Sequence, residues 1–449
     1  MNTKNLLILC FLAFFLLLST IVYASEKEIT LEDYIKLVLK SNPEIEAAKT
    51  DIQFMEGYLD EAEGAVYPRF TFLGLTGPTP EIKGDAHNSD INWNKWGPFF
   101  HGQIDMQLPL YTFGRIPHGR EAAINGMNYA NAKVNEVKGE IILRYKLIYY
   151  GHLLAYSVYK NIVLFAEEKL KTALEKAEEE YDAGSGKVSK ADLGRLKVGL
   201  AELLKRKTEA EKYLDLTKTT LARFIGYKNP DDFKIALKEI EPENVEIKPL
   251  DYYVKRAFKN NPQWNQLNYG IKSRRSLVKL EESSKYPILF LAGRVSGSYS
   301  PVVQDQKTYF ANDPFNDLSG AIAIGLLWQF NFSISGRVKR ADAEYKKLLK
   351  IKKFAQDGIY LLIKKTYLEI IEAKKNIEIY HNGYRAALSW FAFSFLAFES
   401  GTGGAKDAVE GLVAMLLNHY NYYENIFKFN IALAQMSQLV GEEITNLKY

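Results

Sequence analysis

Two different periods of apolar and polar residues alternate along this chain of 449 residues. Between Gly102 and Leu110, apolar side chains occupy every second position, and the same alternation recurs from Ser319 to Phe332. Phe70 and Phe72 open a third run of this kind, and a fourth run extends from Leu289 to Tyr299. Because successive side chains of a strand point to opposite faces, these runs predict four strands of about ten residues.

The longest predicted strand has one bulky face and one small or polar face. Bulky apolar residues share one face, namely Ile322, Ile324, Leu326, Trp328, Phe330 and Phe332, and Ala321, Ala323, Gly325, Gln329 and Asn331 share the other. Strands of this length with aromatic residues near their ends are typical of a transmembrane β-barrel. A soluble amphipathic sheet is the alternative explanation of the alternation.

Helices are predicted in two long tracts without proline, one between Pro117 and Pro230 and the other after Pro314. One uninterrupted helix from Pro117 to Asp182 would be about 100 Å long. Helices of globular domains are much shorter, so the sequence predicts an unusual architecture.

The first of these tracts carries apolar seams with alternating spacings of three and four residues. The seam positions are Met127, Ala130, Val134, Val137, Ile141, Leu193, Leu196, Leu200, Leu203, Ala210, Leu214, Leu221 and Phe224. Lys207 and Thr217 occupy two further positions of the second seam. The pattern predicts antiparallel coiled-coil packing between long helices.

Four strands cannot close a barrel, and an open strand edge cannot lie in lipid. We therefore expect three copies of the chain to form one twelve-stranded barrel, with their long helices continuing as a second, helical barrel. The polar segments Gly77 to Pro98 and Ser300 to Asp317 are expected to be the loops outside the cell.

The chain is an internal duplication. Asn42-Pro43 returns as Asn261-Pro262, and the same offset of 219 superposes Tyr34 on Tyr253. Later markers recur in the same order, "LYTFGRI" as "FSISGRV" and "DAGSG" as "ESGTG". The sequence predicts one repeat over residues 25–226, a linker over 227–249 and a second repeat over 250–449.

Residues 1–24 have the pattern of a secretory signal peptide. Lys4 precedes an apolar stretch from Leu6 to Leu18. The small residue Ala24 ends a typical signal-peptidase site, so we expect cleavage after Ala24. Cys10 is the only cysteine, so the mature chain is expected to lack thiols, which excludes disulfides and thiol catalysis.

Composition and motifs exclude several classes of function. The chain has 58 basic and 54 acidic residues, a near balance that gives no footprint for nucleic acid. "GSGK", Gly184 to Lys187, lacks the other residues of a phosphate-binding loop, and the six scattered histidines lack the spacing of a zinc site. We expect no catalytic residues, no cofactor and no metal.

The predicted strands, long helices, duplication and signal peptide, taken in this order, make the chain resemble the TolC-like outer-membrane efflux proteins, which are trimeric channel-tunnels. The resemblance covers about Ile29 to Gly441, and it is carried by "ITLEDYIKLVLKSNPEIEAA", "PLDYYVKRAFKNNPQ", "PLYTFGRI", "FSISGRV" and the glycine turns. It implies a mainly α-helical fold with a β-barrel part, a homotrimer in outer-membrane lipid, and an α-barrel in the periplasm. The implied partners are a periplasmic adaptor of the membrane fusion type and an inner-membrane transporter of the RND or ABC type.

The resemblance also implies a periplasmic tip with an acidic aperture. The tip turns would contain Gly184, Gly186, Gly401 and Gly403. Asp407 and Glu410, three residues apart on one helix face, match the aperture acids, and Asp192 is the nearest acid of the other turn. Rings of carboxylates would favour cations. An ordinary helix start with acids near its N-terminal dipole is the alternative.

The tip departs from the family pattern in one respect. Phe398 and Gly403 stand where the family often has a tyrosine and an arginine that hold the tip shut, so gating by that bond network is not expected here. Leu388 to Phe398 is apolar on all sides, which favours burial. The alternative is an adaptor-docking patch that includes Phe395 and Phe398.

Two other classes of function fit the sequence less well than an exit duct. A periplasmic coiled-coil scaffold or adhesin without a pore needs no bulky lipid-facing strands, and a simple diffusion porin needs no long helices. Within the duct class, small toxic molecules, metal ions and unfolded proteins stay open as cargo. The six methionines are thinly spread and give no support to a metal exporter.

Overall fold

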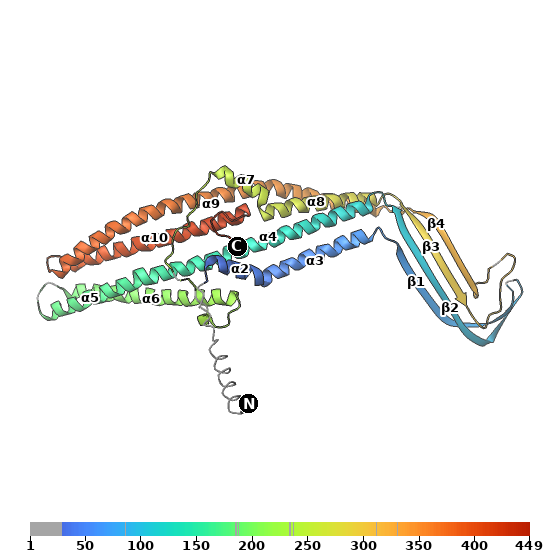
Figure 1. Ribbon diagram of the computed structural model, residues 1–449, viewed down its shortest axis with the longest axis horizontal. Helices are drawn as coiled ribbons and strands as arrows, with labels where there is room; N and C mark the ends of the chain where they lie inside the picture. Colours follow the sequence, from blue (N-terminus) through green and yellow to red (C-terminus); the bar gives the residue numbers. More distant parts are fainter. Residues whose placement is uncertain are drawn as a thin grey trace, which may run out of the picture. The chain divides into compact units, whose positions relative to one another are not determined.

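The computed structural model describes residues 29–449, apart from residues 86, 185, 187, 233, 234, 237, 311 and 330. The predicted signal peptide, residues 1–24, lies outside the described residues, together with Cys10, Ser185, Lys187 and Phe330. The elements are α2 (Leu31–Ser41), α3 (Pro43–Gly64), β1 (Arg69–Gly84), β2 (Ser89–Tyr111), α4 (Arg115–Val158), η1 (Tyr159–Val163), α5 (Leu164–Asp182), α6 (Lys190–Phe224), η2 (Pro230–Asp232), α7 (Leu250–Asn260), α8 (Pro262–Ser283), β3 (Ile288–Tyr299), β4 (Asp317–Leu327), α9 (Ser333–Glu399) and α10 (Ala405–Val440) (Figure 1). Long helices and four strands confirm the predicted fold class.

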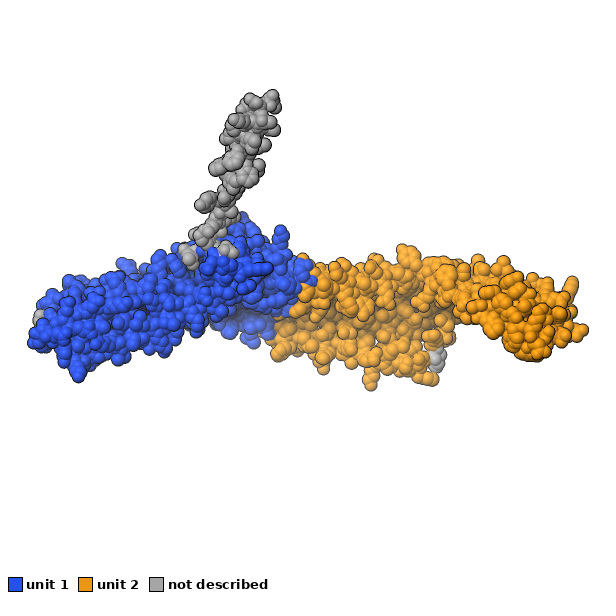
Figure 2. Space-filling model, turned by 90° about the horizontal axis from the view of Figure 1, so that it is seen from below, with its two compact units in different colours: residues 1–46, 136–261, 358–449 blue, residues 47–135, 262–357 orange. Residues whose placement is uncertain are grey.

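The chain forms two compact units (Figure 2). Unit 1 comprises Met1–Glu46, Glu136–Asn261 and Gly358–Tyr449, and unit 2 comprises Ala47–Asn135 and Pro262–Asp357. Each unit combines residues from both predicted repeats, and α4 and α9 contribute residues to both units. The predicted boundaries of the repeats stay a prediction.

The two Asn-Pro sequences interrupt equivalent pairs of helices. Asn42 separates α2 from α3, and Asn261 separates α7 from α8, each with an extended ψ of 123°. Both side chains are buried and hydrogen bonded: Asn42 donates to the Tyr145 hydroxyl over 3.2 Å, and Asn261 donates to the Leu439 carbonyl over 2.8 Å. Asn42 also accepts from the Glu44 amide over 2.8 Å, which caps α3. Each Asn-Pro therefore ends one helix and starts the next.

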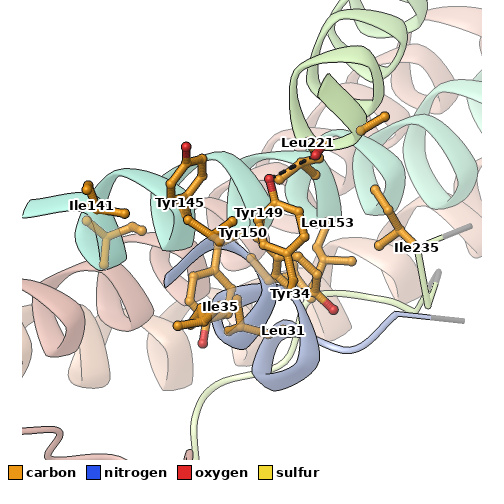
Figure 3. Packing of buried hydrophobic residues seen from close by; sticks show 14 of the residues in the cluster. Leu31, Tyr34, Ile35, Ile141, Tyr145, Tyr149, Tyr150, Leu153, Leu221 and Ile235 are labelled. Carbon is orange, nitrogen blue, oxygen red and sulfur yellow. Dashed lines mark hydrogen bonds between the residues drawn. The ribbon is translucent and has the colours of Figure 1, made fainter. Parts of the chain in front are cut away.

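Unit 1 is held together by a core rich in tyrosine (Figure 3). Tyr34, at the centre of this core, is 1% exposed and donates a hydrogen bond to the Leu221 carbonyl over 3.0 Å. Tyr145 packs edge-on against Tyr34, with their ring centroids 5.8 Å apart. A buried hydroxyl needs a partner, so this bond ties α2 to the end of α6 while the ring fills the core.

The predicted helix from Pro117 to Asp182 is helical throughout, as α4, η1 and α5, with a π-helical turn at Tyr159–Val163. Several predicted seam residues are buried, namely Ala130, Val134 and Ile141 on α4 and Leu196 and Leu221 on α6, whereas Phe224, at the end of α6, is 43% exposed.

The two polar seam residues of α6 each meet a polar partner on a neighbouring helix. Lys207 forms an ion pair with Glu167 over 2.9 Å, and Thr217 lies 2.7 Å from Nδ1 of His152. The hydrogen bonds from Lys171 and Lys207 hold the pKa of Glu167 below its usual range. Burial lowers the pKa of His152 from 6.5 to about 4, so this imidazole is neutral near pH 7.

Unit 2 contains a four-stranded antiparallel sheet in the order β1-β2-β3-β4. β3 and β4 have 12 and 11 residues, close to the predicted length, whereas β1 and β2 have 16 and 23 residues. β4 ends at Leu327 rather than Phe332, and Trp328 and Phe332 therefore follow the strand instead of lying within it.

The predicted loop from Gly77 to Pro98 is wrong, because most of it is strand. Pro78 and Pro80 lie on the edge strand β1, where a missing amide hydrogen is tolerated, and the register shifts between Pro80 and Glu81. From Glu81 to Gly84 the pairs are polar except for Ile82 with Ile91, too few apolar residues to mark a strand in a segment rich in Gly, Pro, Asn and Asp. The second predicted loop, between β3 and β4, is confirmed.

The helices of unit 2 follow the same order as its strands. Glu63 of α3 pairs with Arg120 of α4 over 2.8 Å, and Ser273 of α8 donates to the Ala122 carbonyl of α4 over 3.0 Å. Arg274 of α8 pairs with Glu344 of α9 over 2.5 Å. The layer therefore runs α3-α4-α8-α9, with α3 and α9 at its two edges, as β1 and β4 are at the edges of the sheet.

Candidate functional site

One face of the sheet is apolar and exposed. Phe72, Ile104 and Val295 are cross-strand neighbours on β1, β2 and β3, and they are 73%, 43% and 53% exposed. On β4 the same face carries Ile322, Ile324 and Leu326, each more than 60% exposed. An apolar surface of this extent is rare on a soluble monomer and marks a face that contacts lipid or another protein.

The opposite face of the sheet is polar. Asp105 of β2 forms an ion pair with Arg294 of β3 over 2.6 Å, and Gln103 donates a hydrogen bond to the same carboxylate. Ser298 lies 2.9 Å from Nδ1 of His101 on the next pair along. The predicted alternation of bulky apolar and small or polar faces is therefore confirmed for β2, β3 and β4, whereas on β1 the exposed Leu73 and Leu75 lie on the polar face, opposite Gln103 and His101.

Both edges of the sheet are largely unpaired. In the described part of the chain, β4 pairs with β3 alone, and the free edge of β1 is bridged only at Ile82, by Val303 of the β3-β4 loop. Gln306 from the same loop donates to the Gly84 carbonyl over 2.8 Å. The loop is thus bound to the far end of the long hairpin, and the rest of the β1 edge keeps its hydrogen-bonding groups available.

The helices of unit 2 enclose an apolar groove of about 1220 Å³. Side chains of all four helices line it, including Phe54, Tyr58, Leu277 and Leu348. The sequence analysis missed this groove because its lining residues come from four helices that are far apart along the chain.

Unit 1 ends in two helical turns that contain the predicted tip glycines. Gly184, Gly186 and Gly401 have φ values of +65°, +72° and +70°, which L-residues with a side chain rarely adopt. Gly403 is required for space instead, since a Cβ there would lie 2.8 Å from the Cβ of Ala397. All four glycines therefore have a local structural reason.

The three predicted aperture acids have different surroundings. Asp407 and Glu410 are exposed on the first turns of α10, and Glu410 lies 3.8 Å from Lys406. Asp192 instead forms a capping box with Ser189 at the start of α6, and these hydrogen bonds hold its pKa below the usual range. The capping role of Asp192 matches the alternative of an ordinary helix start. Among the described residues, the hydrogen bonds of the Asp192 side chain go to Ser189 and Arg195, and none connects it to Asp407 or Glu410.

Phe395 and Phe398 are half-buried against a core cluster of the tip. This cluster joins α5, α6, α9 and α10 through Leu170, Leu196, Phe391 and Leu412. The most exposed large apolar side chains between Leu388 and Phe398 are Phe393 and Leu396, at 76% and 62%, followed by Trp390 at 47%. Lys176 and Glu399 add an ion pair of 2.7 Å between α5 and α9.

The sequence analysis also missed the most buried charge in unit 1. The side chain of Lys146 is 2% exposed and pairs with Glu443 over 2.6 Å, and the Tyr449 hydroxyl donates to the same carboxylate. The Lys146 ammonium holds the pKa of Glu443 below its usual range, against the effect of burial. No local pattern marks a pair whose members are 297 residues apart.

No helix among the described residues is both long enough and apolar enough to cross a membrane. Within the same residues, no group of three His, Cys, Asp or Glu side chains is placed to hold a metal ion.

Comparison with protein-family models and with curated sequences gives no match. Solved structures do match. The outer-membrane channel OprN is 14% identical, with 92% of this chain and 89% of that chain covered and a TM-score of 0.75. VceC, an outer-membrane protein of Vibrio cholerae, is 14% identical, with coverages of 92% and 96% and a TM-score of 0.74. The CmeC outer-membrane channel of Campylobacter jejuni is 12% identical, with coverages of 93% and 87% and a TM-score of 0.76. The chain therefore has the channel-tunnel fold that its resemblance to the TolC-like proteins predicted.

Proposed function

We propose that this chain, with its channel-tunnel fold, forms a homotrimeric exit duct through which substrates leave the periplasm across the outer membrane. The observation that carries the proposal is the sheet of unit 2. One of its faces is apolar and exposed, the other is polar, and both of its edges have free hydrogen-bonding groups. Such a sheet is complete only when further strands close it and lipid covers its apolar face.

Three copies would close the sheet. The β1 edge of one copy would pair with the β4 edge of the next, which gives twelve strands in a ring. The ion pair between Asp105 and Arg294 then faces the water-filled interior, and Ile322 and its neighbours face lipid. At Ile82 the β3-β4 loop occupies the edge of β1, so a neighbouring copy cannot pair with β1 there. The part of the β1-β2 hairpin beyond Ile82 would therefore extend out of the membrane.

The helices would form the periplasmic part of the duct. We propose that it receives substrates from a periplasmic adaptor and an inner-membrane transporter of the RND or ABC type. Conduction through the duct is passive and needs no catalytic group or cofactor. Asp407 and Glu410 are exposed at the helix start, where threefold symmetry would repeat them as carboxylate rings that attract cations. Asp192 is a weaker candidate for these rings because its carboxylate caps α6.

The adaptor would contact the tip of unit 1. Phe393 and Leu396 are better placed for this contact than Phe395 and Phe398, because the first pair is exposed and the second packs against the core cluster. A role of Phe395 and Phe398 in docking stays a prediction, and their packing gives them a role in holding the four tip helices together.

Single-channel conductance in planar bilayers, with gel migration of heated and unheated samples, tests the proposal. We expect a heat-sensitive trimer with a small current that prefers cations. Replacing Asp407 and Glu410 with alanine should reduce the preference for cations and raise the open probability. Replacing Asp192, whose carboxylate caps α6, should change the conductance less. As a matched control, replacing the exposed acids Glu202 and Glu209 of α6 should leave the current unchanged.

A protein that stays in solution as a helical rod, with neither membrane insertion nor current, would overturn the duct. That result would favour a periplasmic coiled-coil scaffold or adhesin without a pore.

A further inference from the structure

The two edge helices of unit 2 have unpartnered sides of opposite charge. The α3 segment in this unit, residues 47–64, has five acidic residues and one lysine. The first part of α9, residues 333–357, has eight basic and three acidic residues. In the internal repeat α3 corresponds to α8 and α9 corresponds to α4, so the two edge helices are not copies of each other.

The free side of α9 is a row of lysines. The contacts of α9 with α8 are made by Arg337, Glu344 and Lys352, which share one side of the helix. At 100° per residue, the opposite side carries Lys339, Ala343, Lys346, Lys350 and Lys353. We call this row the α9 edge. Its four lysines are exposed. Lys346 lies 2.7 Å from Asp342, one turn earlier on α9, and no ion pair in the described part of the chain joins these four lysines to another helix.

The free side of α3 is acidic. Met55 and Glu63 mark the side that packs on α4, since Met55 contacts Gly126 and Glu63 pairs with Arg120. The side away from α4 carries Gln53, Gly57, Asp60 and Glu61, and Glu61 also borders the groove of unit 2. Glu56, seven residues before Glu63, lies at the border between this side and the side that packs on α4. We call this row the α3 edge. Glu56, Asp60 and Glu61 are exposed and belong to none of the ion pairs found among the described residues.

We propose that the α9 edge of one copy packs against the α3 edge of the next copy, so that opposite charges select the correct neighbour when the ring closes. This inference rests on the proposed trimeric duct. The sheet order supports it, because α3 leads into β1 and α9 follows β4, and these are the two strands whose edges must meet between copies. The occupant of each edge is therefore a second copy of this chain.

The rows match in direction and height. α3 runs toward the sheet and α9 runs away from it, so the two helices are antiparallel at the contact. Asp60 lies four residues before the end of α3, and Lys339 lies six residues after the start of α9. At about 1.5 Å per residue, the two levels differ by less than one helical turn. Gly57 and Ala343 lie at similar levels, where small side chains allow the backbones to approach closely.

The charges act mainly on the choice of partner. An exposed ion pair contributes little to stability, whereas like charges placed against each other exclude a wrong partner. Pairing α9 with α9, or α3 with α3, would bring lysines against lysines or acids against acids. Only the arrangement in which each copy contacts the next in the same sense joins opposite charges, and that arrangement closes a ring.

Charge reversal in purified full-length protein tests the proposal. One variant carries Lys339→Glu, Lys346→Glu and Lys350→Glu on the α9 edge. A second carries Glu56→Lys, Asp60→Lys and Glu61→Lys on the α3 edge, and a third combines both sets. The matched control is Lys272→Glu, Arg275→Glu and Lys279→Glu on α8, an inner helix of the same layer. The readout is the trimer fraction in detergent from light scattering, at about 50 mM and about 500 mM salt, with far-ultraviolet circular dichroism to confirm folding.

We expect the trimer fraction to fall about tenfold at low salt in each single-edge variant and to recover in the combined variant. The α8 control should stay within about twofold of the unmodified protein, and high salt should reduce the loss in the single-edge variants. Charge pairing at the seam is overturned if the single-edge variants keep their trimer, or if the combined variant is not rescued. An α9 variant that stays trimeric but loses binding to vesicles of anionic lipid would assign the lysines to lipid headgroups and also overturn it. If the unmodified protein itself forms no trimer, it is the proposed duct that fails.

Discussion

Replacing Ile322 with arginine tests which face of the sheet contacts lipid. Ile322 is 79% exposed and lies at the middle of β4, five residues from either end. An arginine at the centre of the lipid-facing band costs about 2–4 kcal/mol. Three copies would raise this cost to about 6–12 kcal/mol for one barrel. A cost of this size is comparable to the whole stability of an ordinary domain, so few barrels should fold.

The matched control is Ala323→Arg, one residue further along the same strand. Ala323 lies on the face that carries Asp105 and Arg294, which would line the water-filled interior. The new charge stays hydrated there. Although Ala323 lies at the same depth in the membrane as Ile322, we expect Ala323→Arg to lower the stability of the barrel by less than about 1 kcal/mol.

The assay is folding of each variant into lipid vesicles as a function of urea, followed by the heat-sensitive shift on gels. The expected order of stability is unmodified protein, then Ala323→Arg, then Ile322→Arg by a wide margin. Equal losses, or a greater loss for Ala323→Arg, would refute the assignment of the two faces, and with it the lipid-facing role of the apolar row.

Three further predictions concern unit 1. Lys146→Met leaves the Glu443 carboxylate buried without its cation, so it should destabilise the unit by about 3–5 kcal/mol in urea unfolding, and adding Glu443→Gln should recover most of this loss. The pKa of His152 falls from 6.5 to about 4 on folding, so the unfolded chain takes up the proton first and the unit should lose up to about 3 kcal/mol as pH falls from 6.5 to 4. Hydrogen exchange at both ends of this range would detect the loss, and His152→Gln should remove it; an unchanged pH dependence would contradict the assignment. Asn42→Ala removes the cap of α3 and the bond to Tyr145, so the melting temperature should drop by an amount equivalent to about 1–2 kcal/mol, whereas Asn42→Asp, which keeps the cap, should cost less.

The strands were predicted best where one face is apolar. From Gly102 to Leu110 and from Ile322 to Leu326, the alternation located both the strands and their faces. The outer part of the β1-β2 hairpin was predicted as loop because it is rich in Gly, Pro, Asn and Asp and has few apolar residues. It is strand because β1 and β2 hydrogen bond to each other and the β3-β4 loop binds at Ile82.

The helices show the same division. The seam spacing predicted buried residues of α4 and α6. It also identified Lys207 and Thr217 as polar residues at seam positions, but it could not predict their hydrogen-bonding partners. Their partners, Glu167 and His152, come from other helices, and only the packing of those helices brings them within 2.9 and 2.7 Å.

By itself, the sequence determined the period of each segment, the duplication and the helix breaks at Asn42 and Asn261, because these depend on neighbouring residues and on backbone geometry. Tertiary structure decided which distant groups meet. It buried Lys146 against Glu443, placed Phe393 outside and Phe395 inside, and left the charged sides of α3 and α9 unpartnered at the two edges of one layer. These outcomes depend on how the helices are ordered and rotated in space, and that information is shared across the whole chain rather than held in any one segment.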